Sequence, residues 1–100
     1  MIMKLWVSAS IEVSDLSRLN AAKNAMSLLV GETIKEIGCI RFEIHQHLEM
    51  PQTFTLWEIW QDEASLAHHF EMPHTKQYLA HGFTTVNYIE KMVGLAGPKP

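Results

Sequence analysis

The chain has 100 residues, which corresponds to about one domain with a small core. Hydrophobic residues make up 47% of the sequence and charged residues 19%, which is more apolar surface than a domain of this size can readily bury alone. We therefore expect the chain to oligomerise. The formal net charge of −3 and the scattered Lys and Arg residues provide no basic surface for a phosphate backbone, so nucleic acid is not an expected partner.

Cysteine usage and hydropathy bear on the compartment. The single cysteine, Cys39, excludes an internal disulfide framework and fits a reducing, cytoplasmic environment. It follows Gly38 without an activating pattern of Lys or Arg, so we interpret it as a small buried hydrophobic residue. The apolar run at residues 3–7 is too short for a signal peptide, and no run has the length needed to span a bilayer, so no membrane association is expected.

The first part of the chain predicts a strand followed by a helix. Apolar residues occupy every second position over residues 3–13, which is typical of a strand. Asp15 then supplies N-cap chemistry, and apolar residues recur at three- and four-residue steps after it. The apolar positions of this helix are Leu16, Leu19, Ala22, Met26, Leu29, Val30 and Ile37. Gly31 interrupts the pattern and leaves open a kink or a short second helix over residues 32–37.

Two further strands are expected to form a hairpin. The second strand follows Gly38 and the third covers residues 54–60, with a turn at residues 49–52 because proline cannot serve inside a paired strand. One face of the second strand carries Ile40, Phe42, Ile44 and Leu48, and the other carries Arg41, Glu43, His45 and His47. The third strand places Phe54, Leu56, Glu58 and Trp60 on one face and Thr55, Trp57 and Ile59 on the other.

The last part of the chain predicts two helical pieces and a strand. Asp62 can cap a helix that Pro73 breaks, and a second helical piece over residues 74–81 ends at Gly82. A final strand over residues 85–93 follows.

The order strand, helix, strand, strand, helix, strand is the split βαβ pattern of ferredoxin-like α+β domains. We expect one domain over residues 1–94 and a flexible tail over residues 95–100. The helices can cover only one face of the sheet. Because Trp6 and Trp57 lie on the other face, we expect that face to pack against a second copy and form a homodimer.

The region from Gly38 to His74 carries the most specific pattern in the chain. Its residues, in order, are Gly38-Cys39-Ile40, Phe42, Phe54, Glu58, Trp60, Ala64, Leu66, His69 and Pro73-His74. In type, order and spacing this set resembles the antibiotic biosynthesis monooxygenase domain, a family that includes quinol monooxygenases. The resemblance extends from the first strand to about residue 81.

This resemblance implies a dimeric α/β barrel with a pocket between the sheet and the helices of each subunit. It also implies oxidation of a phenol or quinol by dioxygen without flavin, haem or metal, since the deprotonated substrate itself passes an electron to oxygen. By position, Trp60 and His45 match a tryptophan and a histidine that approach the substrate in studied members. An asparagine that assists in some members has no counterpart, because Leu56 lies there. The remaining candidates for substrate binding are His47, Phe42, Leu56 and His74.

Glu58 is a carboxylate in the middle of an apolar strand, so it must be paired or have a raised pKa. His69 on the following helix is its expected hydrogen-bond partner. In a structural interpretation this pair only fixes the helix to the sheet. In a functional interpretation, Glu58 orients His69 as a general base. For Trp60, the two interpretations are that it lines the pocket or that it packs in the core.

The six histidines also raise the question of a metal. His45, His47 and Glu49 place three potential ligands on one strand face, which His69 or His74 could complete. Because this run ends at a hairpin turn, we predict no dedicated metal site.

The sequence thus predicts a cofactor-independent monooxygenase that oxidises a small aromatic, phenolic or quinol-like molecule with dioxygen. The proposed catalytic residues are His69, His45 and Glu58. Two alternatives stay open: a non-enzymatic dimeric barrel that binds an apolar ligand, and an isomerase on the same scaffold.

Overall fold

The computed structural model describes residues 3–100. The elements are β1 (Leu5–Val13), the 3-10 turn η1 (Leu16–Arg18), α1 (Leu19–Thr33), β2 (Cys39–Gln46), β3 (Thr53–Trp60), α2 (Glu63–His69), α3 (Pro73–Ala80) and β4 (Thr84–Met92). Within this range no helix combines the length and the apolar character that crossing a bilayer requires.

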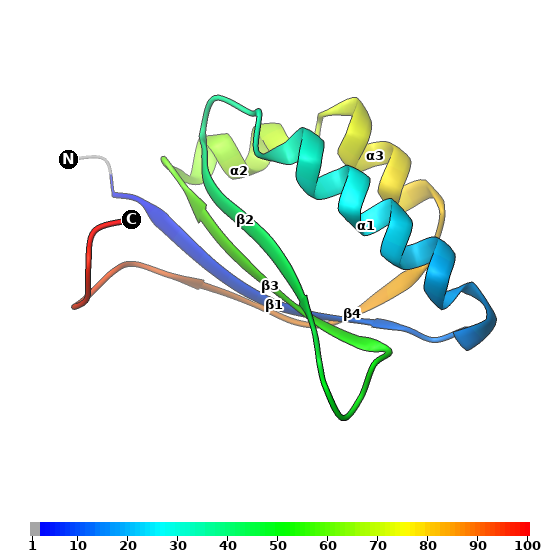
Figure 1. Cartoon of the computed structure of the whole chain (residues 1–100). Coiled ribbons are helices and arrows are strands. Elements are labelled where there is room, and N and C mark those ends of the chain that lie inside the picture. The colour runs from blue at the N-terminus through cyan, green and yellow to red at the C-terminus, as the bar shows by residue number, and fades with distance from the viewer. Residues whose placement is uncertain (1–2) are drawn as a thin grey trace.

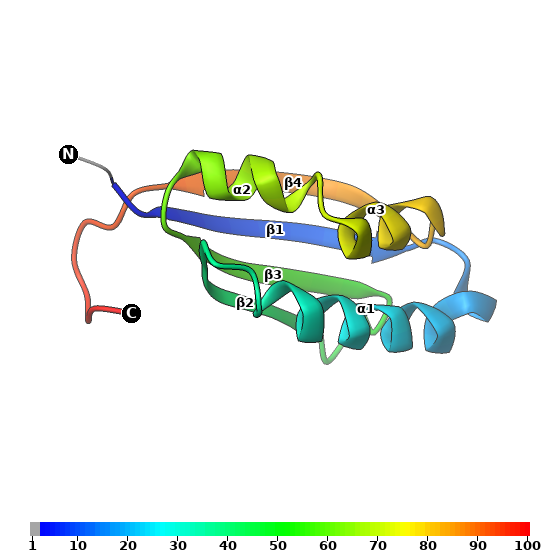
Figure 2. The same cartoon turned by 90° about the horizontal axis from the view of Figure 1, so that it is seen from above.

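The strands form one antiparallel sheet in the order β2-β3-β1-β4. All three helices lie on one face of this sheet, and the other face is left without a helix (Figure 1). Seen from above, α1 lies over β2, and α2 lies over β4 (Figure 2). This two-layer arrangement confirms the predicted ferredoxin-like α+β fold.

The core lies between β1 and α1. The odd-numbered residues of β1 from Leu5 to Val13 are all buried on the helix side, as period-two alternation requires. Ala22, Met26 and Leu29 are the buried positions of α1 that belong to the same cluster, and they recur at the spacing of one helical face. Burial of these side chains drives the helix onto the sheet.

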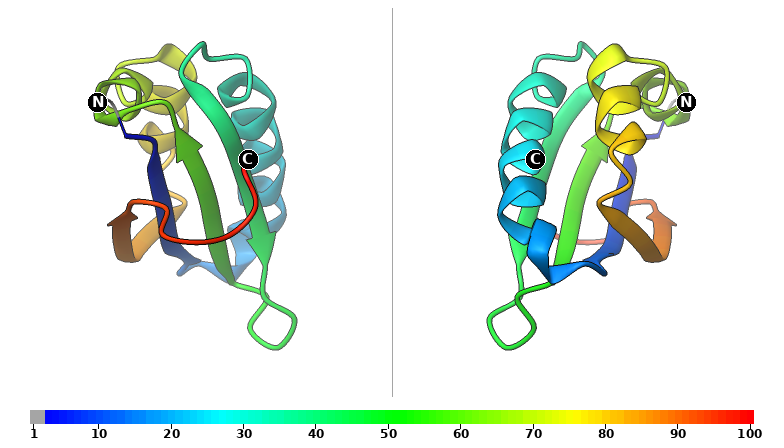
Figure 3. Two further views of the ribbon diagram at one scale, coloured as in Figure 1. Left: turned by 90° about the vertical axis from the view of Figure 1, so that its left-hand side faces the viewer. Right: turned by 90° about the vertical axis from the view of Figure 1, so that its right-hand side faces the viewer.

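Three expectations for this half of the chain are wrong in detail. α1 continues through Gly31 to Thr33, and residues 34–38 do not form the short second helix that the sequence left open. Ile37, which was assigned to the apolar face of the helix, lies beyond its end and is fully exposed. Leu48 is likewise fully exposed, because β2 already ends at Gln46 and the residue lies in the hairpin loop, which projects from the sheet in Figure 3.

The helix boundaries in the second half follow the predicted signals. The Asp62 carboxylate accepts a hydrogen bond from the Ser65 backbone N–H, with a donor–acceptor distance of 2.7 Å, and so caps α2. Pro73 occupies the first turn of α3, where its missing N–H has no helical partner to lose. Gly82 ends the segment with a φ of +63°, a conformation that favours glycine.

The edge strand β4 contains a bulge opposite β1. Ser10 pairs with Tyr88 and Ile11 with Val86, so Asn87 is an extra residue in β4. The Asn87 side-chain amide donates to the Ser10 hydroxyl at 3.1 Å.

The sheet face opposite the helices is partly apolar. Trp57, Tyr88 and Met92 lie on it, with 42%, 45% and 38% of their surface exposed. The segment after Met92 forms no further helix or strand.

Gly31, inside α1, and Gly38, in the connection from α1 to β2, differ in the space available for a side chain. A Cβ on Gly38 would collide with the side chain of Ser65, whose hydroxyl donates to Asp62 at the start of α2. A Cβ on Gly31 would meet no heavy atom within 4 Å. We expect Gly38→Ala to lower the free energy of unfolding by about 1–3 kcal/mol. Gly31→Ala should raise it by about 0.5–1 kcal/mol, because glycine is unfavourable inside a helix.

Urea denaturation of both variants tests this pair of expectations. Equal effects of the two substitutions would contradict the close packing of Gly38 against α2.

Candidate active site

A pocket of about 700 Å³ lies between the sheet and the helices α2 and α3. Its walls are mostly apolar, with the sheet side formed by Val7, Ala9, Ile11, Leu56, Val86 and Ile89. The helix side is formed by Leu66, Ala67, Phe70, Tyr78 and Leu79. Glu58 and His69 are polar residues in this wall, and both are buried. Such a mixture of apolar area with few polar groups is typical of small-molecule sites.

His69 is the last residue of α2, and its ring is held by hydrogen bonds on one side. Its Nδ1 donates to Glu36 Oε2 at 2.7 Å, and the Thr75 hydroxyl oxygen lies 3.2 Å from the same nitrogen. A proton on Nδ1 leaves the lone pair of the neutral ring on Nε2. Burial lowers the pKa of His69, although the Glu36 carboxylate acts in the opposite direction. His69 therefore contributes to the pocket wall a neutral imidazole whose proton is on Nδ1.

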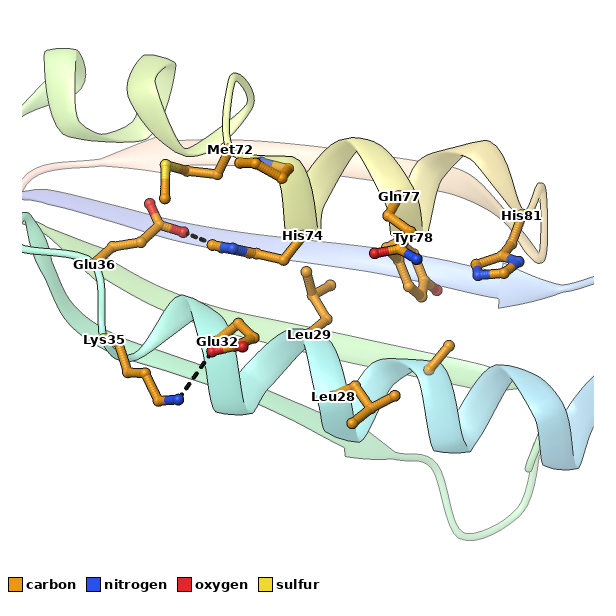
Figure 4. Close-up of a pocket in the computed structure, with 12 residues that line it drawn as sticks. Leu28, Leu29, Glu32, Lys35, Glu36, Met72, His74, Gln77, Tyr78 and His81 are labelled. Atoms are coloured by element: carbon orange, nitrogen blue, oxygen red, sulfur yellow. Dashed lines mark hydrogen bonds and ion pairs between the residues drawn. The ribbon is translucent and has the colours of Figure 1, made fainter.

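The predicted hydrogen bond between Glu58 and His69 is wrong, because Glu36 is the carboxylate that holds His69. Glu36 lies in the connection between α1 and β2, and its side chain is only 4% exposed. Its Oε2 also accepts a hydrogen bond from His74 Nε2 at 2.7 Å, which Figure 4 shows from the side of α1 and α3. No local pattern marks Glu36, since its two partners follow 33 and 38 residues later.

Glu58 is instead paired with its neighbour on β3. Trp60 Nε1 donates to Glu58 Oε1 at 2.8 Å, because residues two apart on a strand share a face. Burial raises the pKa of the Glu58 carboxyl, while the hydrogen bond from Trp60 opposes that rise. Glu58 is thus a carboxyl inside an apolar pocket, and burial shifts its pKa toward the neutral form.

Trp60 packs in the core behind the pocket wall, against His69. It is completely buried and does not line the pocket itself. Its ring lies 4.9 Å from that of His69 and 6.3 Å from that of Phe42, measured between centroids. Of the two predicted roles, packing in the core is the one that this position fits.

The structure places the remaining histidines outside the pocket. His45 is exposed and contacts Glu43 at 3.0 Å, while His47 contacts the Thr55 hydroxyl at 2.8 Å. His74 lines a separate groove between α1 and α3. Of the candidates drawn from the sequence, the pocket brings together His69, Glu58, Phe42 and Leu56, and it leaves His45, His47, His74 and Trp60 outside its wall.

The surroundings of Cys39 disfavour its thiolate, the nucleophilic form of the residue. The residue is partly buried, and burial, together with the Glu36 and Glu58 carboxylates, raises the pKa of its thiol to about 11. Its position agrees with the interpretation of Cys39 as a packing residue.

The sheet, the helices and the pocket define a class of protein: a ferredoxin-like α+β domain with a small-molecule site between its two layers. The sequence profile of the antibiotic biosynthesis monooxygenase family matches residues 19–81, more than half of the chain. The chain belongs to this family.

Similar proteins extend the match beyond the profile. The chain is 29% identical over 86 residues to the uncharacterized protein YjcS of Bacillus subtilis (strain 168), covering 86% of this chain and 82% of that protein. The solved structure of protein YJCS superimposes with a TM-score of 0.83 at 28% identity, covering 89% and 96% of the two chains. A conserved protein from Methanosarcina mazei Go1 gives a TM-score of 0.74 at 30% identity over 89% and 92% of the chains.

The Glu58–Trp60 pair generates a stability prediction. Glu58→Leu leaves the buried Trp60 N–H without an acceptor, so we expect it to lower the free energy of unfolding by about 1–3 kcal/mol. Glu58→Gln keeps an oxygen acceptor and should cost much less.

The pH dependence of the same pair has a definite sign. A carboxyl whose pKa is raised on folding contributes fully below its ordinary value of 4.5, and this contribution is lost as the pH rises through the folded-state pKa. Glu58→Gln should therefore gain stability relative to the wild type as the pH increases. Denaturation series at several pH values would refute this if the difference between the two proteins stayed constant.

Proposed function

We propose that this chain is a cofactor-independent monooxygenase that oxidises a small phenolic or quinol-like molecule with dioxygen. Membership of the antibiotic biosynthesis monooxygenase family supports the reaction type. The observation that carries the proposal is the buried imidazole of His69 in an apolar pocket, with its Nδ1 fixed by Glu36.

The first step is removal of a phenolic proton. Because Nδ1 of His69 carries the proton shared with Glu36, Nε2 is the nitrogen that can accept one from the substrate. Glu36 then stabilises the imidazolium that forms, as the carboxylate does in a catalytic triad. The apolar walls favour a planar aromatic ring, which buries its own surface in them.

The later steps use electrons of the substrate. The phenolate transfers one electron to dioxygen, and the two radicals combine to form a bond between a ring carbon and oxygen. The O–O bond then breaks, one oxygen atom stays on the ring, and the other leaves as water. A quinol and dioxygen thus yield a hydroxyquinone and water, so no external reductant is required.

Glu58 is suited to a proton-donating role in the same pocket. Its raised pKa favours the neutral carboxyl, and its Oε1 is already engaged by Trp60. A neutral carboxyl can donate a proton to the oxygen atom that leaves as water.

Replacement of the base tests the proposal. We expect His69→Gln to lower turnover of a quinol by on the order of 10²- to 10⁴-fold, the usual range for loss of a general base, while the domain stays folded. Dioxygen consumption in an oxygen electrode, with a panel of quinols and one dioxygen used per quinol, is the measurement.

His45→Gln is the matched control, because His45 is exposed and lies outside the pocket. A loss of turnover in this variant alone would move the base to the other face of the sheet. Product formation without oxygen uptake would indicate an isomerase, and binding without turnover would indicate a ligand carrier.

We also propose that the chain is a homodimer that uses the sheet face opposite the helices. Trp57, Tyr88 and Met92 give this face its apolar character. Exposed apolar patches of this kind are typical of interfaces between subunits.

A charge on this face should dissociate the dimer. We expect Trp57→Lys to sediment as a monomer at micromolar concentration, where the wild type sediments as a dimer. Leu28→Lys, at a position on α1 that is 74% exposed, is the control and should stay dimeric. A folded wild-type monomer at this concentration would contradict the proposal.

A further inference from the structure

The sequence predicted no dedicated metal site, but we infer that Glu36, His69 and His74 form one for a divalent transition-metal ion such as Zn²⁺. We also infer that a bound ion removes the base from the pocket. The effect on the base rests on the proposed function; the binding site does not.

The three side chains converge on one point. Glu36 Oε2 lies 2.7 Å from both His69 Nδ1 and His74 Nε2, and the ligand atoms of the three residues all lie within 4.8 Å of one another. Tetrahedral zinc, with bonds of about 2.0–2.1 Å, keeps its ligand atoms about 3.3 Å apart. Each of the two hydrogen-bonded pairs therefore needs to open by only about 0.6 Å to reach the spacing of zinc ligands.

The second carboxylate oxygen of Glu36 supports the same site. Glu36 Oε1 is buried and has no hydrogen-bond partner among residues 3–100. A buried carboxylate oxygen without a partner is costly, because it has lost its water and gained nothing in exchange. A cation beside Glu36 would satisfy this oxygen.

The donor set favours particular metals. Two imidazoles and one carboxylate are ligands that zinc and ferrous iron accept, and three protein ligands leave a position open for water. Calcium and magnesium prefer oxygen ligands alone, so they fit this cluster poorly. Within residues 3–100, no other group of three or more His, Cys, Asp and Glu residues converges in this way.

An ion can reach the cluster without passing through the pocket. His74 is 18% exposed in its side chain, and it lines a groove of about 620 Å³ between α1 and α3. Figure 4 shows Glu36 and His74 at one end of this groove, with Glu32 on the adjacent turn of α1. The Glu32 carboxylate adds negative charge to the approach, although Lys35 pairs with it at 3.0 Å.

A bound ion changes the tautomer of His69. When Nδ1 ligates a metal, the neutral ring must carry its proton on Nε2. The nitrogen available to the substrate is then a hydrogen-bond donor and cannot accept the phenolic proton. The metal-free protein is thus the active form, and zinc is an inhibitor.

Calorimetric titration tests binding directly. The full chain is stripped with a chelator, dialysed and titrated with ZnCl₂, and CoCl₂ is followed separately by its visible absorption. We expect one ion per chain. Glu36→Gln and His74→Ala should each weaken zinc binding by about 10-fold or more, since each removes one of three ligands.

The exposed histidines provide the matched control. His45→Ala/His47→Ala removes the two histidines that the sequence offered as metal ligands and should leave zinc affinity unchanged. Absence of zinc binding by the wild type, or binding that depends on His45 and His47 and not on Glu36 and His74, would overturn the inference. Circular dichroism of each metal-free variant verifies that it is folded, and His74→Cys, which keeps a donor, should retain cobalt and add a thiolate charge-transfer band.

Oxygen uptake separates the two proposals. Zinc should lower uptake by the wild type and have little effect on the residual uptake of His74→Ala. A protein that binds zinc at this cluster but consumes no oxygen with any quinol would refute the monooxygenase and keep the metal site. Uptake that zinc does not inhibit, despite binding at the cluster, would refute the tautomer argument.

Discussion

The arrangement of the helices depends on one carboxylate oxygen. Burying an ionised carboxylate costs several kcal/mol unless charge-assisted hydrogen bonds replace its water. Glu36 Oε2 receives two such bonds, from His69 at the end of α2 and from His74 in the first turn of α3. The connection after α1, the end of α2 and the start of α3 are thereby held at one point. The position of His69 in the pocket follows from this constraint.

Much of the fold could be predicted from local patterns. Alternation in β1 and the caps at Asp62 and Gly82 act over a few residues, so they can be read directly from the sequence. The errors at Ile37 and Leu48 have a common cause. Ile37 lies four residues past the end of α1, and Leu48 lies two residues past the end of β2, so each continues the period of its element. Periodicity alone does not say where an element stops.

The candidate site was predictable only in part. Glu58 was identified because a carboxyl on an apolar strand face requires a partner, and His69 was chosen as that partner; both do line the pocket. Their actual hydrogen-bond partners were not predicted. Glu58 bonds to Trp60 on its own strand, and His69 bonds to Glu36, which is distant in sequence. A single sequence identifies a residue that needs a hydrogen bond more readily than the residue that provides it.

The bulge at Asn87 affects how the pocket can evolve. Val86 and Ile89 both reach the pocket although they are three residues apart, because the extra residue between them reverses the alternation of β4. Deletion of Asn87 would leave Val86 opposite Ile11 and Tyr88 opposite Ser10, so Ile89 and Lys91 would still face the pocket. An edge strand can therefore absorb a one-residue insertion as a bulge and keep the same side chains facing the pocket.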